Sequence, residues 1–487
     1  MTDHEFSGKS ASEAAPTVAH LSSEERVKIG KDARALAPRS SQAEFVPMPD
    51  RPDPVSLLER QATTRVPELV PIRYGRMLVS PFTFFRGAAL VMASDLATTP
   101  RSGLQAQVCG DAHLSNFGLF ASPERTLMFD VNDFDETLPG PWEWDLKRLA
   151  ASVVIAARDR EFTEKEARTA ALEVGASYRR EMARLAGLST LDVWYSQIDV
   201  AGLLADLEAT ASKTGSKADK RMVSRTVQTI TKARTRDSLQ ALSKLTTVVD
   251  GNLRIVSDPP LIVPTEELFP QEMSDSLRDS FHQLVRSYRR SLQSDRRHLL
   301  EEFQFVQIAR KVVGVGSVGT RAWILLMVGR DNDDPLFLQA KEAEASVLEE
   351  FVGKSGYANH GARVVAGQHL MQAASDIFLG YQPFEGPDGV NRDFYVRQLR
   401  DWKGGFDVEG SIPPGLTRYV GICALALARA HARSGDRVAI ASYLGTGPAF
   451  ERALADFAET YADQNERDYE ALKQAAATGR IAVESGL

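Results

Sequence analysis

The spacing of apolar and polar positions divides the chain into helical stretches and one strand-rich stretch. Apolar residues recur with helical spacing over residues 51–100 and again from 142 to about 245. Between residues 303 and 343, β-prone segments separated by glycines predict strands. Helical spacing returns over residues 417–435 and 450–476. The pattern predicts an α+β protein that is rich in helices.

Shorter elements are predicted around the strand-rich stretch. Residues 251–264 are typical of a hairpin or a pair of short strands, and a charged helix is predicted from about 272 to 300. Two more helices are predicted near residues 344–352 and 361–379, and residues 393–404 predict a strand followed by a turn. A chain of 487 residues exceeds the size at which one core keeps growing, so we expect two or three packed lobes.

Composition and charge narrow the class of protein. With 43% hydrophobic and 25% charged residues, the chain has the composition of an ordinary globular protein. The net charge is −7 and no long Lys/Arg block is present, which argues against general nucleic-acid binding or an anionic-membrane surface. The chain has 2 cysteines, no secretory signal pattern and no apolar run of membrane-spanning length. We therefore expect a cytoplasmic protein that does not bind membranes.

The segment CGDAHLSNFG, here called the Asp111 loop (residues 109–118), follows a predicted strand at residues 104–109. Asp111 and Asn116 stand five positions apart, the D-x-x-x-x-N spacing of kinase-type catalytic loops. In that chemistry the Asp orients a hydroxyl and the Asn side chain binds a metal ion. His113 is expected either to orient the loop or to bind substrate, and a structural role is the alternative. Turn formation alone is the alternative for the whole motif.

A second acidic segment follows on the next predicted hairpin strand, at residues 126–136. It ends in the acidic turn (residues 133–136), whose sequence DFDE resembles the Asp-Phe-Gly of kinases. Asp133 is the first candidate for a second Mg²⁺ ligand, Asp130 is the second, and Asp135 is the remaining one. Hard oxygen ligands of this kind suit Mg²⁺. Helix capping or simple solvation of the carboxylates is the alternative.

A glycine loop (residues 311–319) lies in the strand-rich stretch. Gly314, Gly316 and Gly319 have the G-x-G-x-x-G spacing, which occurs in dinucleotide sites and in kinase phosphate loops. The residues that follow are apolar and β-prone, as expected for the returning strand of a kinase-type hairpin and not for a Rossmann helix. The next predicted strand ends at Lys341, where a kinase carries the Lys that binds nucleotide phosphates.

In kinases this Lys has a Glu partner on a following helix. Glu349 and Glu350 are the candidates here, and Glu344 is a less favoured one. The strand-rich stretch follows the Asp111 loop in sequence, which is the reverse of the ordinary kinase order. The motifs therefore predict a two-lobed, kinase-like fold that is circularly permuted, which chain topology tolerates.

Four segments are expected on this interpretation. They are a loose N-terminal lead-in (1–40), a helix-rich catalytic lobe (41–300), a small nucleotide-binding lobe (301–410) and C-terminal helices packed on the catalytic lobe (411–487). Upstream of the Asp111 loop, Arg73, Arg76 and Arg86 are further polar candidates. A buried Arg86 must find a partner, either an anionic substrate group or a structural carboxylate such as Asp95 or Asp145.

Several long blocks resemble one bacterial family, the domain of unknown function 2252. They include RYGRMLVSPFTFFRGAA, CGDAHLSNFGLFASPER, FDVNDFDETLPGPWEWDLKRLAAS and GQHLMQAASDIFLGY, and the resemblance runs from about residue 25 to residue 480. The Asp111 loop and acidic turn are also similar to those of aminoglycoside phosphotransferases and choline kinase-like enzymes. Two departures from that pattern are Cys109, where many such loops carry His, and Asp135, which replaces Gly.

The motifs favour an ATP- and Mg²⁺-dependent phosphotransferase acting on an acceptor whose class they leave open. One alternative is a nucleotide-binding pseudokinase or regulatory module without turnover. Another is a metal-dependent phosphoesterase that uses Asp111, His113, Asp130 and Asp133, although few additional His or Asp ligand motifs are present. The expected partners are thus a nucleotide and an acceptor.

Overall fold

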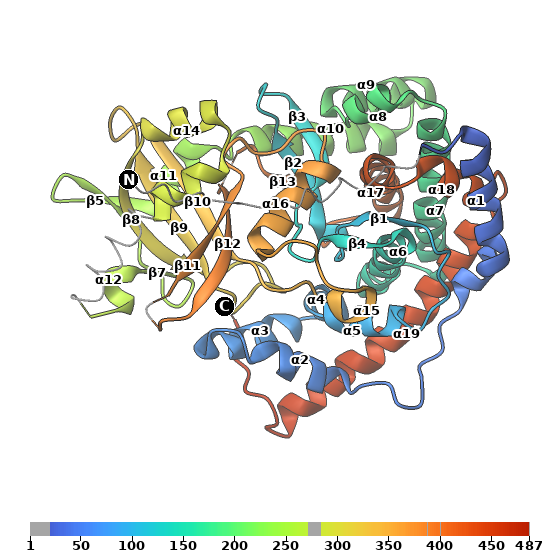
Figure 1. The fold of residues 1–487 in the computed structure, drawn as a ribbon, viewed down its shortest axis with the longest axis horizontal. Coiled ribbons are helices and arrows are strands. Elements are labelled where there is room, and N and C mark those ends of the chain that lie inside the picture. Colours follow the sequence, from blue (N-terminus) through green and yellow to red (C-terminus); the bar gives the residue numbers. More distant parts are fainter. Residues whose placement is uncertain (1–19, 271–283, 387, 400, 487) are drawn as a thin grey trace, which may run out of the picture.

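The computed structural model describes residues 20–486 apart from 271–283, 387 and 400. The described part is a mixed α+β fold with several antiparallel sheets, which confirms the predicted class. Figure 1 shows the strands gathered mainly on one side of the molecule and the long helices on the other. Part of the lead-in predicted at 1–40 and part of the helix predicted at 272–300 lie outside the described residues.

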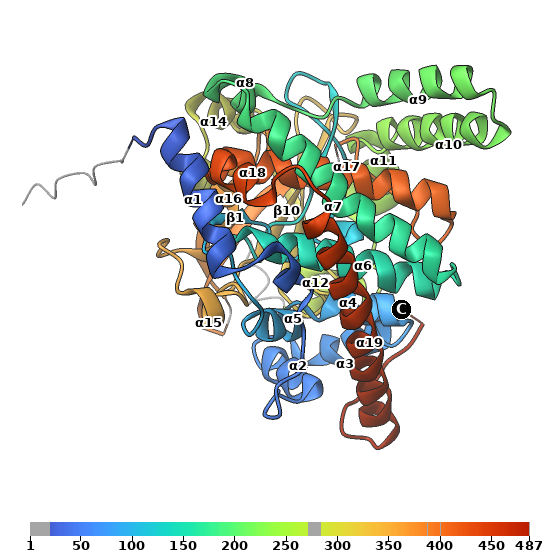
Figure 2. The same ribbon diagram turned by 90° about the vertical axis from the view of Figure 1, so that its right-hand side faces the viewer.

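Long helices form the centre of the helical part. They are α6 (Trp142–Asp159), α7 (Glu164–Ala186), α17 (Pro413–Ser434) and α19 (Ala449–Ala477). α6 is buried along nearly its whole length because α7, α17 and α19 pack against it. α1 (Ser23–Leu36) packs on α18 (Arg437–Leu444), so segments from the two ends of the chain meet (Figure 2). The C-terminal helices thus share a core with helices from the middle of the chain.

Short helices from the N-terminal third pack against this core. They are α2 (Pro54–Ala62), α3 (Val70–Met77), α4 (Pro81–Gly87) and α5 (Ala89–Leu96). α2 and α4 contact α19, and α4 also contacts α6. Asp53 accepts backbone N–H groups at the start of α2, and Ser80 forms a reciprocal cap with Thr83 at the start of α4. These caps define where each short helix begins and so direct the chain between α3 and α4.

The strand-rich part is built on a six-stranded antiparallel sheet with the order β11-β12-β10-β9-β8-β7. Its strands are β7 (Ile262–Pro264), β8 (Gln304–Lys311), β9 (Ala322–Val328), β10 (Pro335–Glu342), β11 (Gly380–Glu385) and β12 (Asn391–Gln398). β8 and β9 form an antiparallel pair across the glycine loop, as the sequence predicts. α16 (His360–Met371) packs against β11 and β12.

Two small sheets carry the candidate loops. β1 (Gln105–Val108) pairs with β4 (Leu138–Pro141), and the order β13-β2-β3 joins β13 (Gly404–Gly405), β2 (Phe117–Ala121) and β3 (Leu127–Val131). The Asp111 loop connects β1 to β2, and the acidic turn connects β3 to β4. Because both connections leave the same pair of small sheets, the two loops lie side by side, and Gly110 closely approaches Glu136.

A largely helical segment separates the two parts. It contains α8 (Thr190–Tyr195), α9 (Val200–Thr214), α10 (Lys217–Arg234), α11 (Ser238–Leu245), β5 (Thr246–Val249) and β6 (Asn252–Ile255). α9 and α10 lie side by side and project from the body (Figure 2). β6 pairs with β5, whereas β7 joins the six-stranded sheet, which confirms the predicted pair of short strands within residues 251–264. Between them, Asp258 and Ile262 form an isolated antiparallel bridge.

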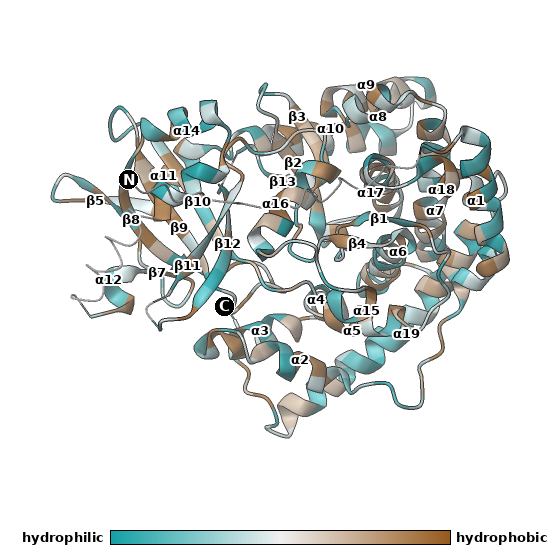
Figure 3. Cartoon of the chain, in the orientation of Figure 1, coloured by the Kyte–Doolittle hydropathy of each residue, from teal (hydrophilic) through white to brown (hydrophobic). Residues whose placement is uncertain are grey.

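The remaining described helices are short. They are α12 (Thr265–Leu268), α14 (Ser294–Glu301) and α15 (Glu349–Val352). The helices predicted at 344–352 and 361–379 are therefore shorter in the structure, as α15 and α16. None of the described helices carries an apolar stretch long enough to cross a membrane, and hydrophilic residues interrupt the helices throughout (Figure 3).

Candidate functional site

The start of the Asp111 loop is held by a carboxylate of α6. The N–H groups of Cys109 and Gly110 donate to the two carboxylate oxygens of Asp145, at 2.8 and 2.9 Å. His431 Nε2 lies 3.2 Å from the same carboxylate, and the hydroxyl of Tyr178 contacts His431 Nδ1 at 2.8 Å. The side chains of Asp145 and His431 are buried. This network fixes the loop to helices α6, α7 and α17.

Gly110 brings the loop close to the acidic turn. Its φ is +80°, a conformation that residues other than glycine adopt at a cost. A Cβ at this position would lie 2.5 Å from the carbonyl oxygen of Glu136. Only glycine fits here, and the close approach places Asp111 next to the acidic turn.

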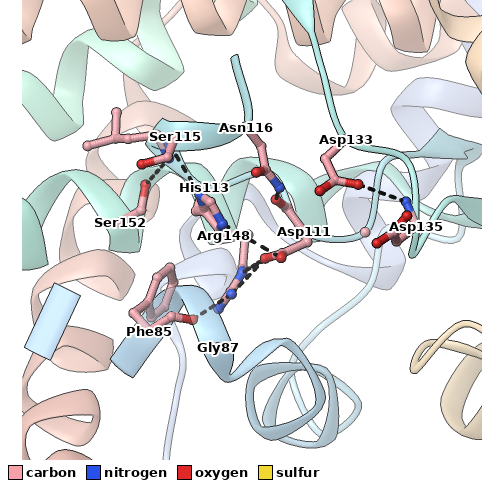
Figure 4. Close-up of polar contacts among 12 residues, drawn as sticks. Phe85, Gly87, Asp111, His113, Ser115, Asn116, Asp133, Asp135, Arg148 and Ser152 are labelled. Carbon is pink, nitrogen blue, oxygen red and sulfur yellow. Dashed lines mark hydrogen bonds and ion pairs between the residues drawn. The ribbon is translucent and has the colours of Figure 1, made fainter. Parts of the chain in front are cut away.

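Asp111 is held by a buried arginine. Arg148 Nε donates to Asp111 Oδ1 at 2.7 Å, and its Nη2 donates to the carbonyl oxygen of Phe85 at 2.7 Å (Figure 4). The guanidinium lies over the Phe85 ring, 3.8 Å from its centroid. On its other side, Asp111 Oδ2 lies 3.7 Å from His113 Nε2. The orientation of the Asp111 carboxylate is therefore set by α6 and by the end of α4.

His113 is a buried, neutral imidazole. Its Nδ1 accepts the N–H of Ser115 at 3.2 Å, so the ring proton lies on Nε2, the nitrogen that faces Asp111. Burial lowers the pKa of His113 to about 3, and the neighbouring guanidiniums of Arg86 and Arg148 act in the same direction, although Asp111 opposes them. The uncharged imidazole thus lies beside Asp111, with Nε2 at 3.7 Å from Oδ2 and beyond hydrogen-bond distance.

Asn116 links the loop to itself and to the acidic turn. Its Nδ2 donates to the carbonyl oxygen of Asp111 at 2.6 Å, and its own carbonyl oxygen accepts the N–H of Asn132 at 2.8 Å. Because the amide nitrogen is used in this way, the side-chain oxygen of Asn116 is left as the group available to a cation. Figure 4 shows Asn116 next to Asp111, with Asp133 nearby.

The acidic turn forms ion pairs with the strand-rich part. Lys341, on β10, makes an ion pair with Asp135 and lies 3.8 Å from Asp133 Oδ2. Tyr395, on β12, donates to Asp135 Oδ1 at 2.8 Å. Burial alone would lower the pKa of Lys341, but Asp133 and Asp135 outweigh it and raise that pKa above its ordinary value. The turn and the sheet are thus joined through a buried lysine.

The two carboxylates of this turn differ in pKa. Burial and the nearby charge of Asp135 raise the pKa of Asp133 above its ordinary value. For Asp135, burial is outweighed by the charge and hydrogen bond of Lys341, and its pKa is lowered. Lys341 therefore balances the negative charge of Asp135. A second cation would be needed to stabilise the ionised form of Asp133 in the same way.

One cavity of about 560 Å³ collects these groups. It is lined by the Asp111 loop, the acidic turn, the glycine loop and the segment after β10, and the sequence-predicted residues on its wall are Asp111, His113, Asn116, Asp133, Gly314, Gly316 and Glu349. Lys341 reaches the cavity through Asp133 and Asp135, which line it. Segments separated by about two hundred residues in sequence therefore meet at one cavity.

The model of the family described as uncharacterised proteins conserved in bacteria, DUF2252, matches residues 65–475. The chain belongs to DUF2252. The matched region contains the Asp111 loop, the acidic turn, the glycine loop and the strand that carries Lys341. No curated protein and no solved structure matches the chain.

The glycine loop of this DUF2252 chain is braced by its N-terminal helices. Gly314 and Gly319 have φ values of +63° and +90°, which favour glycine. Arg76 Nη1 donates to the carbonyl oxygen of Gly314 at 2.6 Å, and the N–H of Val66 donates to that of Gly319 at 2.8 Å. Gly319 itself is not on the cavity wall; the other two glycines are.

Glu349 does not contact Lys341 in the DUF2252 chain. Its buried carboxylate lies 3.6 Å from Lys354 Nζ and 3.8 Å from His360 Nδ1. The helix that follows, α16, contributes Arg363, which donates to the carbonyl oxygens of Thr137 and Asp135. The structure thus differs from the expected pairing, because the acidic turn supplies the carboxylate and the helix braces the turn. The sequence analysis did not identify Arg148, Arg363 or Tyr395 as site residues. The one feature that could have indicated them is a polar side chain within a mostly apolar helix or strand.

Asp130 lies apart from the cavity. It is half-buried on β3, and the charges that act on it are those of Arg429 and Arg433 on α17. Burial raises the pKa of Asp130 to about 7. Asn116 and Asp133 line the cavity and Asp130 does not, because Asp130 lies within β3 and Asp133 lies beyond the end of that strand.

The residues present fit a magnesium site of the kind completed by substrate oxygens. Among the described residues, no cluster of three or more His, Cys, Asp or Glu side chains forms a ready-made metal site. Mg²⁺, however, is usually held by one or two protein oxygens together with water and phosphate oxygens. Asp133 and Asn116, which both line the cavity, are such a pair.

Proposed function

We propose that this DUF2252 protein is an ATP- and Mg²⁺-dependent phosphotransferase. One observation carries the proposal: the Asp111 loop, the acidic turn with Lys341, and the glycine loop border a single cavity. Each of the three supplies a part that phosphoryl transfer requires, namely a group that orients the acceptor, metal ligands, and donors for the nucleotide phosphates. None of the three sequence motifs by itself requires the other two to lie at the same cavity.

The roles follow from the chemistry of each group. Lys341 and the backbone N–H groups of the glycine loop bind nucleotide phosphates, and Asn116 and Asp133 hold Mg²⁺, which neutralises phosphate charge. Asp111 orients the acceptor hydroxyl and takes its proton. The acceptor oxygen forms a bond to the γ-phosphorus, the bond to the β,γ-bridging oxygen breaks, and ADP leaves with that electron pair. Arg148 keeps Asp111 in position.

The arrangement of the sheet supports a kinase-like fold. The glycine loop joins two adjacent strands, the next strand carries Lys341, and a helix follows before the sheet continues. Protein kinases combine a glycine-rich loop, a lysine on the third strand and a following helix in the same way. In this chain the sheet follows the Asp111 loop in sequence, so we infer a circularly permuted order.

A nucleotide-binding module without turnover is the second candidate. The observation that favours it is the ion pair of Arg148 with Asp111, which occupies one oxygen of the proposed base. The replacement of Gly by Asp135 in the acidic turn points the same way, because Asp135 takes up Lys341. The phosphoesterase alternative lacks such support, since Asp130 lies apart from Asp111 and Asp133.

Thermal unfolding with ATP, measured with and without Mg²⁺, tests nucleotide binding. A ligand at 100 times its Kd adds about 2.7 kcal/mol to the stability of the folded state. The wild type should show a Mg²⁺-dependent rise in Tm, and Asp133→Ala should lose it. Asp130→Ala is the matched control, because it removes a carboxylate of the same hairpin outside the cavity, and it should keep the shift. No shift in the wild type at millimolar ATP would refute the proposal.

A further inference from the structure

A buried arginine of the cavity has no acidic partner. Arg65, which follows α2, is 6% exposed and lines the cavity. It donates one hydrogen bond from Nη1 to the carbonyl oxygen of Val318, and its buried Nε has no partner. Among the residues that the structure describes, no carboxylate lies within ion-pair distance of Arg65. The charge of this guanidinium is therefore unbalanced at close range.

Arg86, which is half-buried, is a second arginine of this wall without an acidic partner. It stands in the last turn of α4, lines the cavity, and its buried Nε has no partner. The two carboxylates that the sequence suggested for it are engaged elsewhere. Asp95 is paired with Arg51 at 2.6 Å, and Asp145 holds the Asp111 loop. No hydrogen bond or ion pair of Arg86 is formed within the described part of the chain.

Charges farther away do not replace a direct partner. The carboxylates that act on Arg86 are Asp111 and Glu409, and those that act on Arg65 include Glu344, Glu136 and Asp135. Burial outweighs them and lowers the pKa of both arginines. A guanidinium nevertheless keeps its charge in proteins, and burying it without a partner is costly. Two such groups on one cavity wall are expected where an anion binds.

Other buried arginines of this region show the contrast. Arg73 is fully buried and does not line the cavity; its Nη2 donates to Gln61 and to the carbonyl oxygen of Gly87, while its Nε and Nη1 have no partner. Arg148 is paired with Asp111. An unpartnered donor is therefore not by itself the sign of a ligand, and the position of the donor decides. Arg65 and Arg86 differ because their free donors border the cavity.

Arg86 lies on the acceptor side of the cavity, and Arg65 meets the same glycine loop through the carbonyl oxygen of Val318. Its neighbour Phe85 accepts a hydrogen bond from Arg148, which holds Asp111, so the end of α4 lies beside Asp111 (Figure 4). A Cβ on Gly316 would lie 3.1 Å from the carbonyl oxygen of Arg86, so the glycine loop closes onto the same point. Lys341, which the proposed function assigns to the nucleotide, lies on β10 and meets the acidic turn from the sheet.

We propose that Arg65 and Arg86 form an oxyanion subsite for the acceptor, which carries a phosphate or carboxylate group close to the hydroxyl that is phosphorylated. This inference rests on the proposed function and adds the class of its second substrate. The planar fork of arginine matches such oxyanions by paired hydrogen bonds. The subsite places the acceptor hydroxyl at Asp111 by holding the anionic group beside it.

Inorganic phosphate is the probe, titrated calorimetrically into protein without nucleotide. The wild type should bind phosphate, Arg86→Gln should weaken binding by about tenfold or more, and Lys341→Met should leave it within about twofold, because Lys341 belongs to the nucleotide site. Arg452→Gln, an exposed arginine of α19, controls for the loss of one positive charge and should bind as the wild type does. If Arg86→Gln does not fold, Arg86→Lys keeps the charge without the fork and should also weaken binding.

The same variants titrated with a non-hydrolysable ATP analogue and Mg²⁺ separate the two possible sources of the anion. Arg86→Gln should leave nucleotide affinity within about twofold of the wild type. A comparable loss of nucleotide affinity would assign the arginines to the terminal phosphate of ATP and overturn the inference. Absence of phosphate binding in the wild type, or its loss in Lys341→Met, would also overturn it. If the wild type binds phosphate but not the nucleotide analogue, the proposed function is refuted. The phosphate titration would still show whether Arg86 contributes to an anion site.

Discussion

Asp145 accepts the N–H of Gly110 at 2.9 Å and thereby joins the first turn of α6 to the start of the Asp111 loop. The carboxylate is 1% exposed and also meets His431, whose ring contacts Tyr178. A buried carboxylate that accepts backbone N–H groups makes strong, charge-assisted hydrogen bonds. The position of Asp111 therefore depends on a residue that does not itself line the cavity.

Asp145→Asn should destabilise the protein and displace the loop. An amide has one acceptor oxygen, so one of the two loop N–H groups loses its partner at a cost of about 1–3 kcal/mol. Urea unfolding should show this loss, and transfer activity should fall with little change in nucleotide affinity. Asp159→Asn, at the far end of α6, is the control and should change neither. Unchanged stability in Asp145→Asn would show that the network does not hold the loop.

Asp111→Asn should reduce transfer about 100-fold or more while nucleotide affinity is retained, because the variant loses a proton acceptor and keeps its shape. Arg148 would lose its ionic partner, so unfolding should be measured on the same sample. ADP formation from ATP in the presence of acceptor, with binding measured by calorimetry, separates the two effects. If the wild type binds nucleotide but shows no turnover, the substitution has no activity to abolish and the pseudokinase alternative is correct.

Lys341→Met should cost stability because it leaves Asp135 without its ionic partner. Breaking a buried pair costs about 3–5 kcal/mol, and the partial exposure of Asp135 makes about 3 kcal/mol the upper expectation here. The double variant Lys341→Met/Asp135→Asn removes both charges and should recover at least half of the loss. Nucleotide affinity should stay low in both. Additive losses in denaturant unfolding would contradict a direct coupling between the two residues.

His113→Gln should flatten the acid side of the stability profile. The folded-state pKa of about 3 lies below the ordinary value of 6.5, so between these values the unfolded state binds a proton that the folded state excludes. Stability is therefore lost as the pH falls from 6.5 towards 3. From pH 7.5 to pH 5, the wild type should lose about 2 kcal/mol more than His113→Gln. Exposed His298→Gln should follow the wild type, and an equal slope in His113→Gln would exclude a buried neutral imidazole.

Much of the local structure follows from patterns within a few residues. The glycine loop between two β-prone segments predicted an antiparallel pair, and β8 and β9 form it. The acidic turn and the Asp111 loop were each expected to follow a strand, and each does. These features depend on hydrogen bonds and backbone conformations of near neighbours, which residue type and spacing constrain directly.

Contacts between residues that are distant in sequence could not be predicted from residue spacing in this way. A Glu after β10 was the expected partner of Lys341, but Asp135 lies closer because the acidic turn enters from the helical part and α16 carries Arg363 instead of an acid. Asp130 and Asp133 are near neighbours in sequence, yet one faces α17 and the other the cavity. One-dimensional spacing does not say which of two nearby carboxylates a distant lysine meets.

The sequence by itself determined the α+β class, the family, and the presence of an Asp111 loop, an acidic turn and a glycine hairpin, because each is written in a short stretch of chain. Only the tertiary structure decided that these stretches border one cavity and that Arg65 and Arg86 stand there without acidic partners. The physical reason is that burial and ion pairing depend on which segments pack together, and residues two hundred positions apart acquire their electrostatic partners only when the whole chain has folded.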